Sequence, residues 1–212
     1  MTHFDKNDIH SMPQRYRANF INSLSGFKSA NLVGTVNAKQ QTNLSIISSA
    51  FHIGADPALM GFISRPHSVD RHTLENLIET GYYTLNHVHT GIIDEAHQTS
   101  ARYERDESEF TETGLNELWH DGFSAPFVNE SFVRIGLAYK EHHTLVNNTV
   151  MVLGEIILVD LPKGSIKDDG LVDMTMTNTV AVSGLDSYHS PKKVKRLGYA
   201  KPHQPVCIID KG

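Results

Sequence analysis

The chain has 212 residues and a mass of 23.6 kDa, with 39% apolar and 20% charged residues, which is typical of one globular domain with a substantial core. The formal net charge of −5 argues against nucleic acid as the partner, and no apolar run reaches the roughly 18 residues of a membrane span. The polar N-terminus lacks the apolar core of a secretory signal, and one cysteine, Cys207, cannot form an internal disulfide. We therefore expect a cytoplasmic protein.

The first half of the chain is predicted to mix strands with short helices. An extended or partly helical segment over residues 1–28 comes first. Apolar runs rich in β-branched and aromatic residues then predict four strands, at 31–37, 42–51, 58–64 and 82–88. Polar turns are expected at 37–41 and 52–57. Leucine and isoleucine at helical spacing predict a helix over 72–80 that stops at Gly81, and a second helix is predicted over 91–103.

The second half is predicted to contain a long hairpin. The acidic segment 104–114 is expected to be a solvated loop or a short helix. Two long strands follow at 131–146 and 149–161, and the residues between them are typical of a hairpin turn. Gly154, inside the second strand, indicates a bulge or a close backbone contact. Many strands with few short helices predict a mostly β protein, a closed antiparallel barrel with peripheral helices.

The loop Ser64-Arg65-Pro66-His67-Ser68 joins a buried strand to a helix start. Unpaired N–H groups and the helix dipole make such a position suitable for an anion. The alternative is an ordinary capped loop, with Ser68, Asp70 or Thr73 as the helix cap. The residues of the loop do not decide between these interpretations.

The segment 42–51 is unusually polar for a strand of a β core. It holds a set of hydroxyl and amide side chains between its apolar residues: Thr42, Asn43, Ser45, Ser48 and Ser49. One interpretation is a solvated face, and the other is a strand edge that presents polar groups to a flat ligand. An unsatisfied buried polar group costs about 1–3 kcal/mol, so these side chains need hydrogen-bond partners, either water or a ligand.

The 13 histidines raise the question of a metal site. His87 and His89 share one strand face, and His142 and His143 are adjacent, but none forms an HExxH pair or another spacing typical of zinc ligands. Structural or surface roles are therefore favoured over a metal site. A hydrolase that uses these histidines with a metal stays as a third functional hypothesis.

The order of these features resembles the flavin reductase-like family, whose fold is the FMN-binding split barrel. The polar strand, the Asp-Pro turn and the Ser-Arg-Pro loop are followed by "ETGYYTLN", "AHQTSARYERDESEF", "VMVLGEIILV" and "VSGLDSYHSPKKVKRLGYAKP". The resemblance covers residues 21–205, and leaves an N-terminal extension at 1–20 and a tail at 206–212.

The resemblance implies non-covalent FMN in a homodimer, with the flavin site near the subunit interface. Arg65, with Ser64, His67 and Thr73, would hold the phosphate. Asn43, Ser45, Ser48 and Ser49 would meet the isoalloxazine and ribityl groups. Three further residues are expected near the flavin, from this subunit or its neighbour: His97, Thr99 and Ser100. No catalytic residue is assigned.

The resemblance also implies an oxidoreductase, a flavin reductase that takes hydride from NADH or NADPH. No G-x-G-x-x-G sequence follows a strand, so the nicotinamide would bind transiently over the flavin rather than in a Rossmann domain. A downstream oxygenase or another electron acceptor would be the partner. The alternative is a non-catalytic FMN-binding electron carrier or redox sensor.

Overall fold

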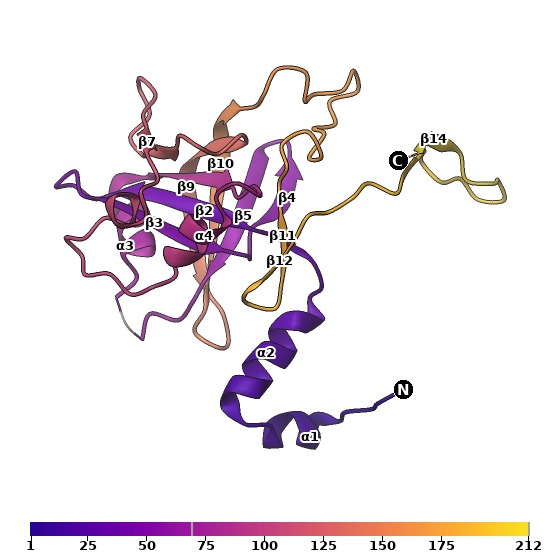
Figure 1. The fold of residues 1–212 in the computed structure, drawn as a ribbon, viewed down its shortest axis with the longest axis horizontal. Helices are drawn as coiled ribbons and strands as arrows, with labels where there is room; N and C mark the ends of the chain where they lie inside the picture. The colour runs from indigo at the N-terminus through magenta and orange to yellow at the C-terminus, as the bar shows by residue number, and fades with distance from the viewer. Residues whose placement is uncertain (69, 212) are drawn as a thin grey trace.

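A seven-stranded antiparallel sheet forms the centre of the molecule in the computed structural model, which describes residues 1–68 and 70–211 (Figure 1). The strand order is β3-β2-β6-β9-β10-β5-β4. The bounds of these strands are β2 Asn31–Val36, β3 Thr42–Ile47, β4 Phe51–Ala55, β5 Ala58–Ser64, β6 Tyr82–His87, β9 Arg134–Thr144 and β10 Val150–Asp160. This mostly β architecture confirms the fold class expected from the sequence.

The polar segment 42–51 is divided between two strands, which corrects the prediction of one continuous strand. β3 and β4 occupy opposite edges of the sheet. The division follows from Ser49, whose hydroxyl donates to the carbonyl of Ile63 and accepts from its N–H, at 2.8 and 3.1 Å. These two bonds tie the chain to β5 after it leaves β3. β4 then continues to Ala55, inside the segment predicted as a turn.

The helices beside the sheet are α3 (His72–Thr80), α4 (Ile93–Gln98) and α5 (Glu109–Thr113). α3 has the predicted bounds and ends at Gly81, whose φ of +79° favours glycine. α4 is shorter than the predicted helix over 91–103 and has Thr99 as its C-cap residue. The Thr99 hydroxyl donates to the Ala96 carbonyl and accepts from the Ile46 N–H. α5 forms in the segment where a loop or short helix was expected.

β9 and β10 form the predicted long hairpin, and their register shifts between Leu153 and Gly154. A Cβ on residue 154 would lie 2.4 Å from the hydroxyl oxygen of Tyr83. The position is therefore both a bulge and a close contact, as the sequence indicated.

Two hydrophobic clusters hold the helices against the sheet. One cluster joins Leu32 and Leu44 to Ala96 of α4 and Phe110 of α5. The other packs the apolar face of α3 on the opposite part of the sheet and consists of buried residues that include Leu74, Leu77, Phe62, Tyr83, Leu137 and Val152. α3 and the α4–α5 pair therefore lie on different parts of the core, and both contact the edge strand β3.

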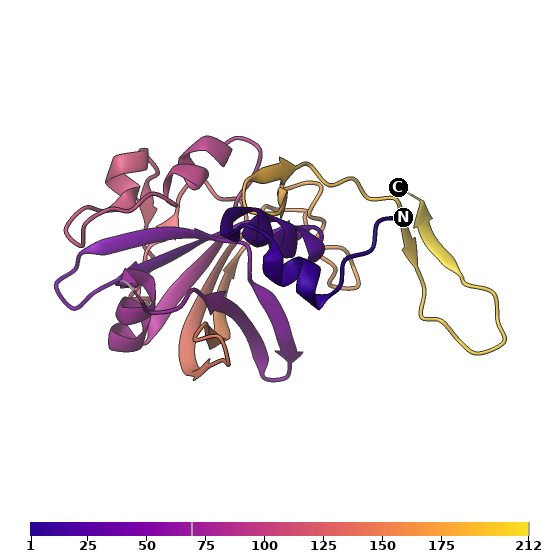
Figure 2. The ribbon, with the colours of Figure 1, turned by 90° about the horizontal axis from the view of Figure 1, so that it is seen from below.

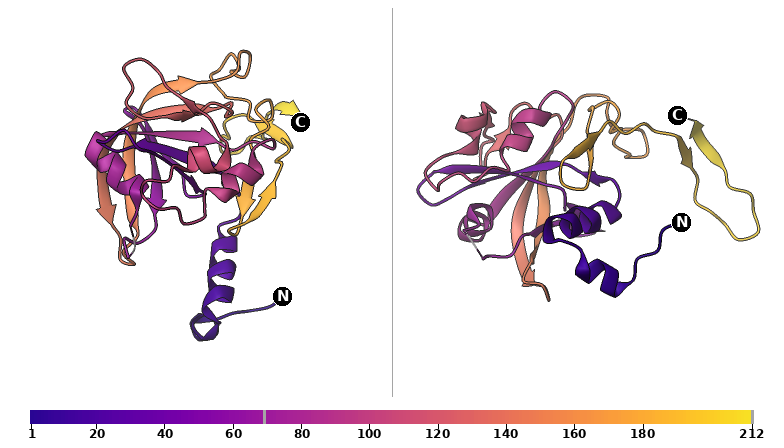
Figure 3. Two further views of the ribbon diagram at one scale, coloured as in Figure 1. Left: turned by 60° about the vertical axis from the view of Figure 1, so that its left-hand side comes forward. Right: turned by 60° about the horizontal axis from the view of Figure 1, so that its bottom comes forward.

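Small sheets of two or three short strands and both termini surround this body. β7 (Glu117–Leu118) pairs with β8 (Phe127–Val128), while β1 (Lys28–Ser29), β11 (Ala181–Ser183) and β12 (Ser187–His189) form a small sheet. α1 (Lys6–Ser11) and α2 (Gln14–Leu24) extend away from the body (Figures 1 and 3). The hairpin of β13 (Lys195–Leu197) and β14 (Ile208–Lys211) also lies away from the body (Figures 2 and 3). The predicted boundary at 205/206 therefore falls between two paired strands. No helix in residues 1–68 and 70–211 is long and apolar enough to cross a membrane.

Candidate functional site

The N-terminus of α3 carries no side-chain cap among residues 1–68 and 70–211. Arg71 is the N-cap residue, and no described side chain bonds the first-turn N–H groups, so the three candidate caps considered from the sequence are not used in that way. The N–H of Arg71 itself donates to Oε1 of Glu75 at 3.1 Å. The free N–H groups of the first turn and the helix dipole together make this end of α3 electropositive.

Three arginines gather at this helix end. Burial lowers the pKa of Arg71, and the nearby guanidinium groups of Arg65 and Arg102 lower it further. The Nε of Arg71 donates to the carbonyl of Pro66 at 3.2 Å, which fixes it against the Ser-Arg-Pro loop. Arg102 arrives from the segment after α4, and sequence reasoning missed it because its proximity depends on the tertiary fold. The site therefore concentrates positive charge from two separate chain segments.

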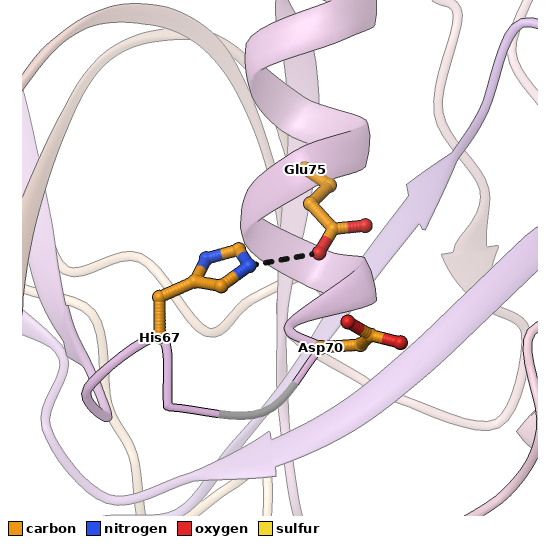
Figure 4. Close-up of side chains that lie close together, drawn as sticks. All are labelled: His67, Asp70 and Glu75. Atoms are coloured by element: carbon orange, nitrogen blue, oxygen red, sulfur yellow. Dashed lines mark ion pairs between the residues drawn. The ribbon is translucent and has the colours of Figure 1, made fainter.

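Glu75 organises the side chains beside these arginines. His67 lies 3.1 Å from one carboxylate oxygen, and Arg105 forms an ion pair with the other. Figure 4 shows His67 pointing at Glu75 across the start of α3, with Asp70 in the turn below. Burial lowers the pKa of His72, and Arg105 lowers it further, while Asp70 and Glu104 raise it. Arg105, like Arg102, is a residue that the sequence pattern alone did not single out.

His67, Asp70 and Glu75 also form a group of potential metal ligands among the residues that the structure describes, with ligand atoms within 4.8 Å of one another. Glu75, however, already accepts from the Arg71 N–H and pairs with Arg105 as well as His67. A divalent cation would have to displace these donors. His67 is therefore held by Glu75, and its contact with the flavin phosphate stays a prediction.

A polar patch on β3 lies directly against the first turn of α3. The Asn43 amide donates to Oγ1 of Thr73 at 3.0 Å, and the Ser45 hydroxyl lies 2.8 Å from the same oxygen. Asn43 is buried, whereas Ser45 and Thr73 are half-buried. Asn43 and Ser45 alternate with Leu44, which belongs to the core on the other face. The strand therefore has one polar face that is turned to α3 rather than to bulk solvent.

The remaining serines of the predicted site lie around the ends of β3 and β5. Ser48 is half-buried in the segment after β3. The Ser49 hydroxyl forms two hydrogen bonds with the backbone of β5, as described above. It therefore has a structural role that does not require a ligand. Ser64 ends β5, and its hydroxyl makes a long contact of 3.4 Å with the carbonyl of Arg65. Arg65 is exposed and is the first residue beyond that strand.

The residues expected from α4 have different environments. Thr99 is buried, and its hydroxyl oxygen accepts a hydrogen bond from the N–H of Ile46 on the edge strand β3. His97 is exposed, and its Nδ1 lies 3.0 Å from the hydroxyl of Tyr188 in β12. Ser100 is exposed and donates its N–H to the His97 carbonyl. No hydrogen bond or ion pair among the described residues links these three side chains to the arginine cluster.

Comparison with known proteins identifies the class of this chain. Residues 24–179 match the model of the flavin reductase like domain. The uncharacterized protein YwrF of Bacillus subtilis (strain 168) is 26% identical over 126 residues, which are 59% of this chain and 58% of that protein. The match thus spans a little over half the length of this curated relative.

Solved structures show the same fold along nearly the whole chain. A split barrel domain protein of Shewanella frigidimarina NCIMB 400, assigned as a flavin reductase, is 50% identical with a TM-score of 0.91, covering 94% of this chain and 100% of that one. Nitrilotriacetate monooxygenase component B of Bacillus cereus is 15% identical with a TM-score of 0.82, covering 93% and 98%. The chain belongs to the flavin reductase-like family, as its sequence motifs indicated.

Proposed function

We propose that this protein binds FMN non-covalently and acts as an oxidoreductase that takes reducing equivalents from NADH or NADPH. The observation that carries the proposal is the uncapped N-terminus of α3, where Arg71 is fixed against the Ser-Arg-Pro loop and Arg65 of that loop is exposed. Membership of the flavin reductase-like family supports the flavin chemistry. One fold hosts many functions, so the donor set of this site, rather than the fold, supports the assignment.

The donors at this helix end fit a phosphate monoester. Arginine offers a planar fork that can bond two phosphate oxygens at once, and helix N–H groups supply further donors. Arg65 is exposed and has no ion-pair partner among the described residues, so its fork is available to a ligand. Glu75 holds Arg105 and His67 beside the site and offsets part of the positive charge. The residues present therefore match the phosphate end of FMN.

The polar face of β3 extends the site away from the phosphate position. Ser45 and Thr73 supply hydroxyls, and Asn43 fixes the orientation of the Thr73 oxygen through its amide. Such a group of neutral donors and acceptors suits the hydroxyls of a ribityl chain. When bound, the flavin supplies the redox chemistry, and the protein contributes binding, orientation and the polarity of the surroundings.

A paired titration tests the phosphate assignment. The apo-protein is titrated with FMN and with riboflavin, which lacks the phosphate, in the wild type and in Arg65→Ala. Hydrogen bonds to charged groups are worth about 1.5–3 kcal/mol, so FMN affinity should fall about 10- to 150-fold while riboflavin affinity changes little. Arg65→Lys should recover part of the loss, because it keeps the charge but not the fork.

Arg15→Ala provides a matched control, because Arg15 is exposed on α2, away from this site. It should leave both affinities unchanged. Equal effects of Arg65→Ala on FMN and riboflavin would reject the phosphate role of Arg65.

A second measurement separates a reductase from a non-catalytic flavoprotein. Steady-state oxidation of NADH and NADPH is followed with FMN present and a soluble electron acceptor added. Turnover that depends on FMN supports the reductase. Tight FMN binding without turnover of either nicotinamide would favour the alternative, an electron carrier or redox sensor.

The proposal includes a homodimer with the flavin site near the subunit interface, and an oxygenase or another acceptor downstream. FMN is large and flat, and a cleft between two subunits provides the concavity that ligand sites need. Substitutions at such an interface should weaken FMN binding and assembly together. Independent losses of the two would count against a shared site.

A further inference from the structure

The carboxylate of Glu75 lies at the start of α3 and has several donors around it. Its Oε1 accepts from the backbone N–H of Arg71, the N-cap residue, at 3.1 Å. The same oxygen lies 3.1 Å from Nε2 of His67, and Oε2 forms an ion pair with Arg105. Capping of the helix start needs only the bond to the backbone N–H. The contacts with His67 and Arg105 therefore go beyond helix capping.

The groups around this carboxylate are of the kinds that bind a phosphate. They are a backbone N–H at a helix start, an imidazole nitrogen and a guanidinium group. Phosphate oxygens accept from the same donors, and a guanidinium bonds two of them at once. Glu75 is thus an anion of the chain itself, held by donors that suit the phosphate of a ligand.

The side chains that Glu75 holds are accessible from solution. The side chains of His67 and Arg105 are 48% and 46% exposed. Neither residue belongs to the helix: His67 lies in the Ser-Arg-Pro loop, from which its ring reaches Glu75 (Figure 4), and Arg105 lies between α4 and α5. Exposed ion pairs contribute little free energy. An incoming dianion can therefore replace the carboxylate as the partner of these two side chains.

Competition of this kind weakens the binding of a phosphate. A phosphate that takes donors from Glu75 gains only the difference between two charge-assisted contacts, and it leaves a carboxylate next to a dianion, which it repels. Asp70 adds a second carboxylate, because ligand atoms of His67, Asp70 and Glu75 lie within 4.8 Å of one another. Arg65 has no ion pair with Glu75 among the described residues, so it adds affinity without this cost.

We propose that Glu75 competes with the phosphate of FMN for His67 and Arg105, so that FMN exchanges with the solution as a substrate and is not retained as a tight cofactor. Glu75 is a positioning residue: it holds the two side chains before FMN binds and releases them to the phosphate. The inference rests on the proposed phosphate site and names the residue that governs how readily flavin leaves it.

The variant Glu75→Gln tests this competition, because glutamine keeps an oxygen for the Arg71 N–H and loses the charge. Fluorescence titration should show FMN affinity rising about three- to tenfold, while riboflavin affinity stays unchanged. Stopped-flow trapping of released FMN should show slower dissociation by a similar factor. A purely structural role predicts the opposite, since loss of the ion pairs would loosen the site. Weaker binding of FMN in this variant would therefore overturn the proposal.

The variant Glu79→Gln is the matched control. Glu79 is exposed in the last turn of the same helix, so the substitution removes the same charge at the other end of α3. It should leave FMN affinity unchanged. An equal gain in both variants would show that net charge, and not the position of Glu75, sets the affinity, which overturns the proposal.

A double-mutant cycle with Arg105→Met tests what Glu75 releases. The gain in FMN affinity from Glu75→Gln should shrink when Arg105 is also replaced, because the guanidinium that becomes available to the phosphate is then missing. The same gain with and without Arg105 would overturn the competition for donors. Circular dichroism of each variant checks that the fold is unchanged.

Two further measurements complete the test. Wild-type protein saturated with FMN should lose the flavin on gel filtration, and retention of one FMN per chain would overturn the proposal without any variant. The variant Arg65→Ala separates this inference from the phosphate assignment. A selective loss of FMN affinity in Arg65→Ala, with no gain in Glu75→Gln, overturns the role of Glu75 alone. Equal effects of Arg65→Ala on FMN and riboflavin overturn the phosphate assignment and this inference with it.

Discussion

The amide of Asn43 donates a hydrogen bond of 3.0 Å to the hydroxyl oxygen of Thr73, which joins the edge strand β3 to the first turn of α3. Asn43 is buried, so it depends on this acceptor. Thr73→Val keeps the shape and removes the oxygen, and we expect the free energy of unfolding to fall by about 1–3 kcal/mol. Thr73→Ser retains the hydroxyl and should lose clearly less. Urea denaturation measures both, and equal losses would show that the methyl group, not the hydrogen bond, matters.

Tyr83 occupies the space that a side chain at position 154 would need. A Cβ at that position would lie 2.4 Å from the hydroxyl oxygen and 2.9 Å from two ring carbons. Gly154→Ala should therefore lower the free energy of unfolding by about 1–3 kcal/mol through overpacking. The Tyr83 hydroxyl is buried without a hydrogen-bond partner among the described residues, so Tyr83→Phe alone should cost little. Combining the two changes should reduce the cost of the alanine, and strict additivity in a double-mutant cycle would contradict the contact.

His87 should make stability depend on pH. Its Nδ1 is buried with no hydrogen-bond partner in the part of the chain that the structure describes, and burial lowers the pKa of His87 to about 4. The unfolded imidazole titrates near pH 6.5, so the unfolded state binds the proton more readily. The contribution of His87 is therefore complete above about pH 6.5 and is lost as the pH falls toward 4, by up to about 3 kcal/mol. Denaturant titrations from pH 7 to 4 should show that the free energy of unfolding depends less on pH in His87→Gln than in the wild type. The same pH dependence in both proteins would show that His87 is not the group responsible.

Glu109 supplies an acceptor to a backbone N–H on the edge of the sheet. Its carboxylate accepts from the Leu44 N–H at 2.8 Å, and burial raises the pKa of Glu109. Glu109→Ala leaves that buried N–H unsatisfied, and we expect a loss of about 1–3 kcal/mol in the free energy of unfolding. Glu109→Gln keeps an oxygen and should lose less. Amide hydrogen exchange at Leu44 provides a local check, since protection should fall in the alanine variant.

Periodicity and turn residues predicted the parts of the fold that depend on neighbouring residues. The bounds of α3, its stop at Gly81 and the β9–β10 hairpin follow from such local signals. The division of 42–51 into β3 and β4 could not be predicted, because it depends on Ser49 reaching the backbone of a strand that comes later in the chain.

The candidate site shows the same limit. Arg65 was identified from its loop, which lies between a strand and a helix start. Arg102 and Arg105 reach α3 only because the chain after α4 passes beside it, and no spacing in the sequence records that proximity. Thr99 was expected near a ligand; its hydroxyl accepts from the Ile46 N–H of the edge strand, a contact that a sequence pattern does not express.

The side-chain and helix contacts along β3 also govern how copies of this protein behave when they meet. Glu109 and Thr99 accept hydrogen bonds from the N–H groups of Leu44 and Ile46 at the edge of the sheet. These N–H groups are therefore not available to pair with a strand of another molecule. The shield consists of Thr99, the C-cap residue of α4, and Glu109 of α5. We expect that local unfolding of residues 93–113 would expose the N–H groups of Leu44 and Ile46 to strand addition, so aggregation on heating should follow the local stability of that segment rather than the melting of the whole sheet.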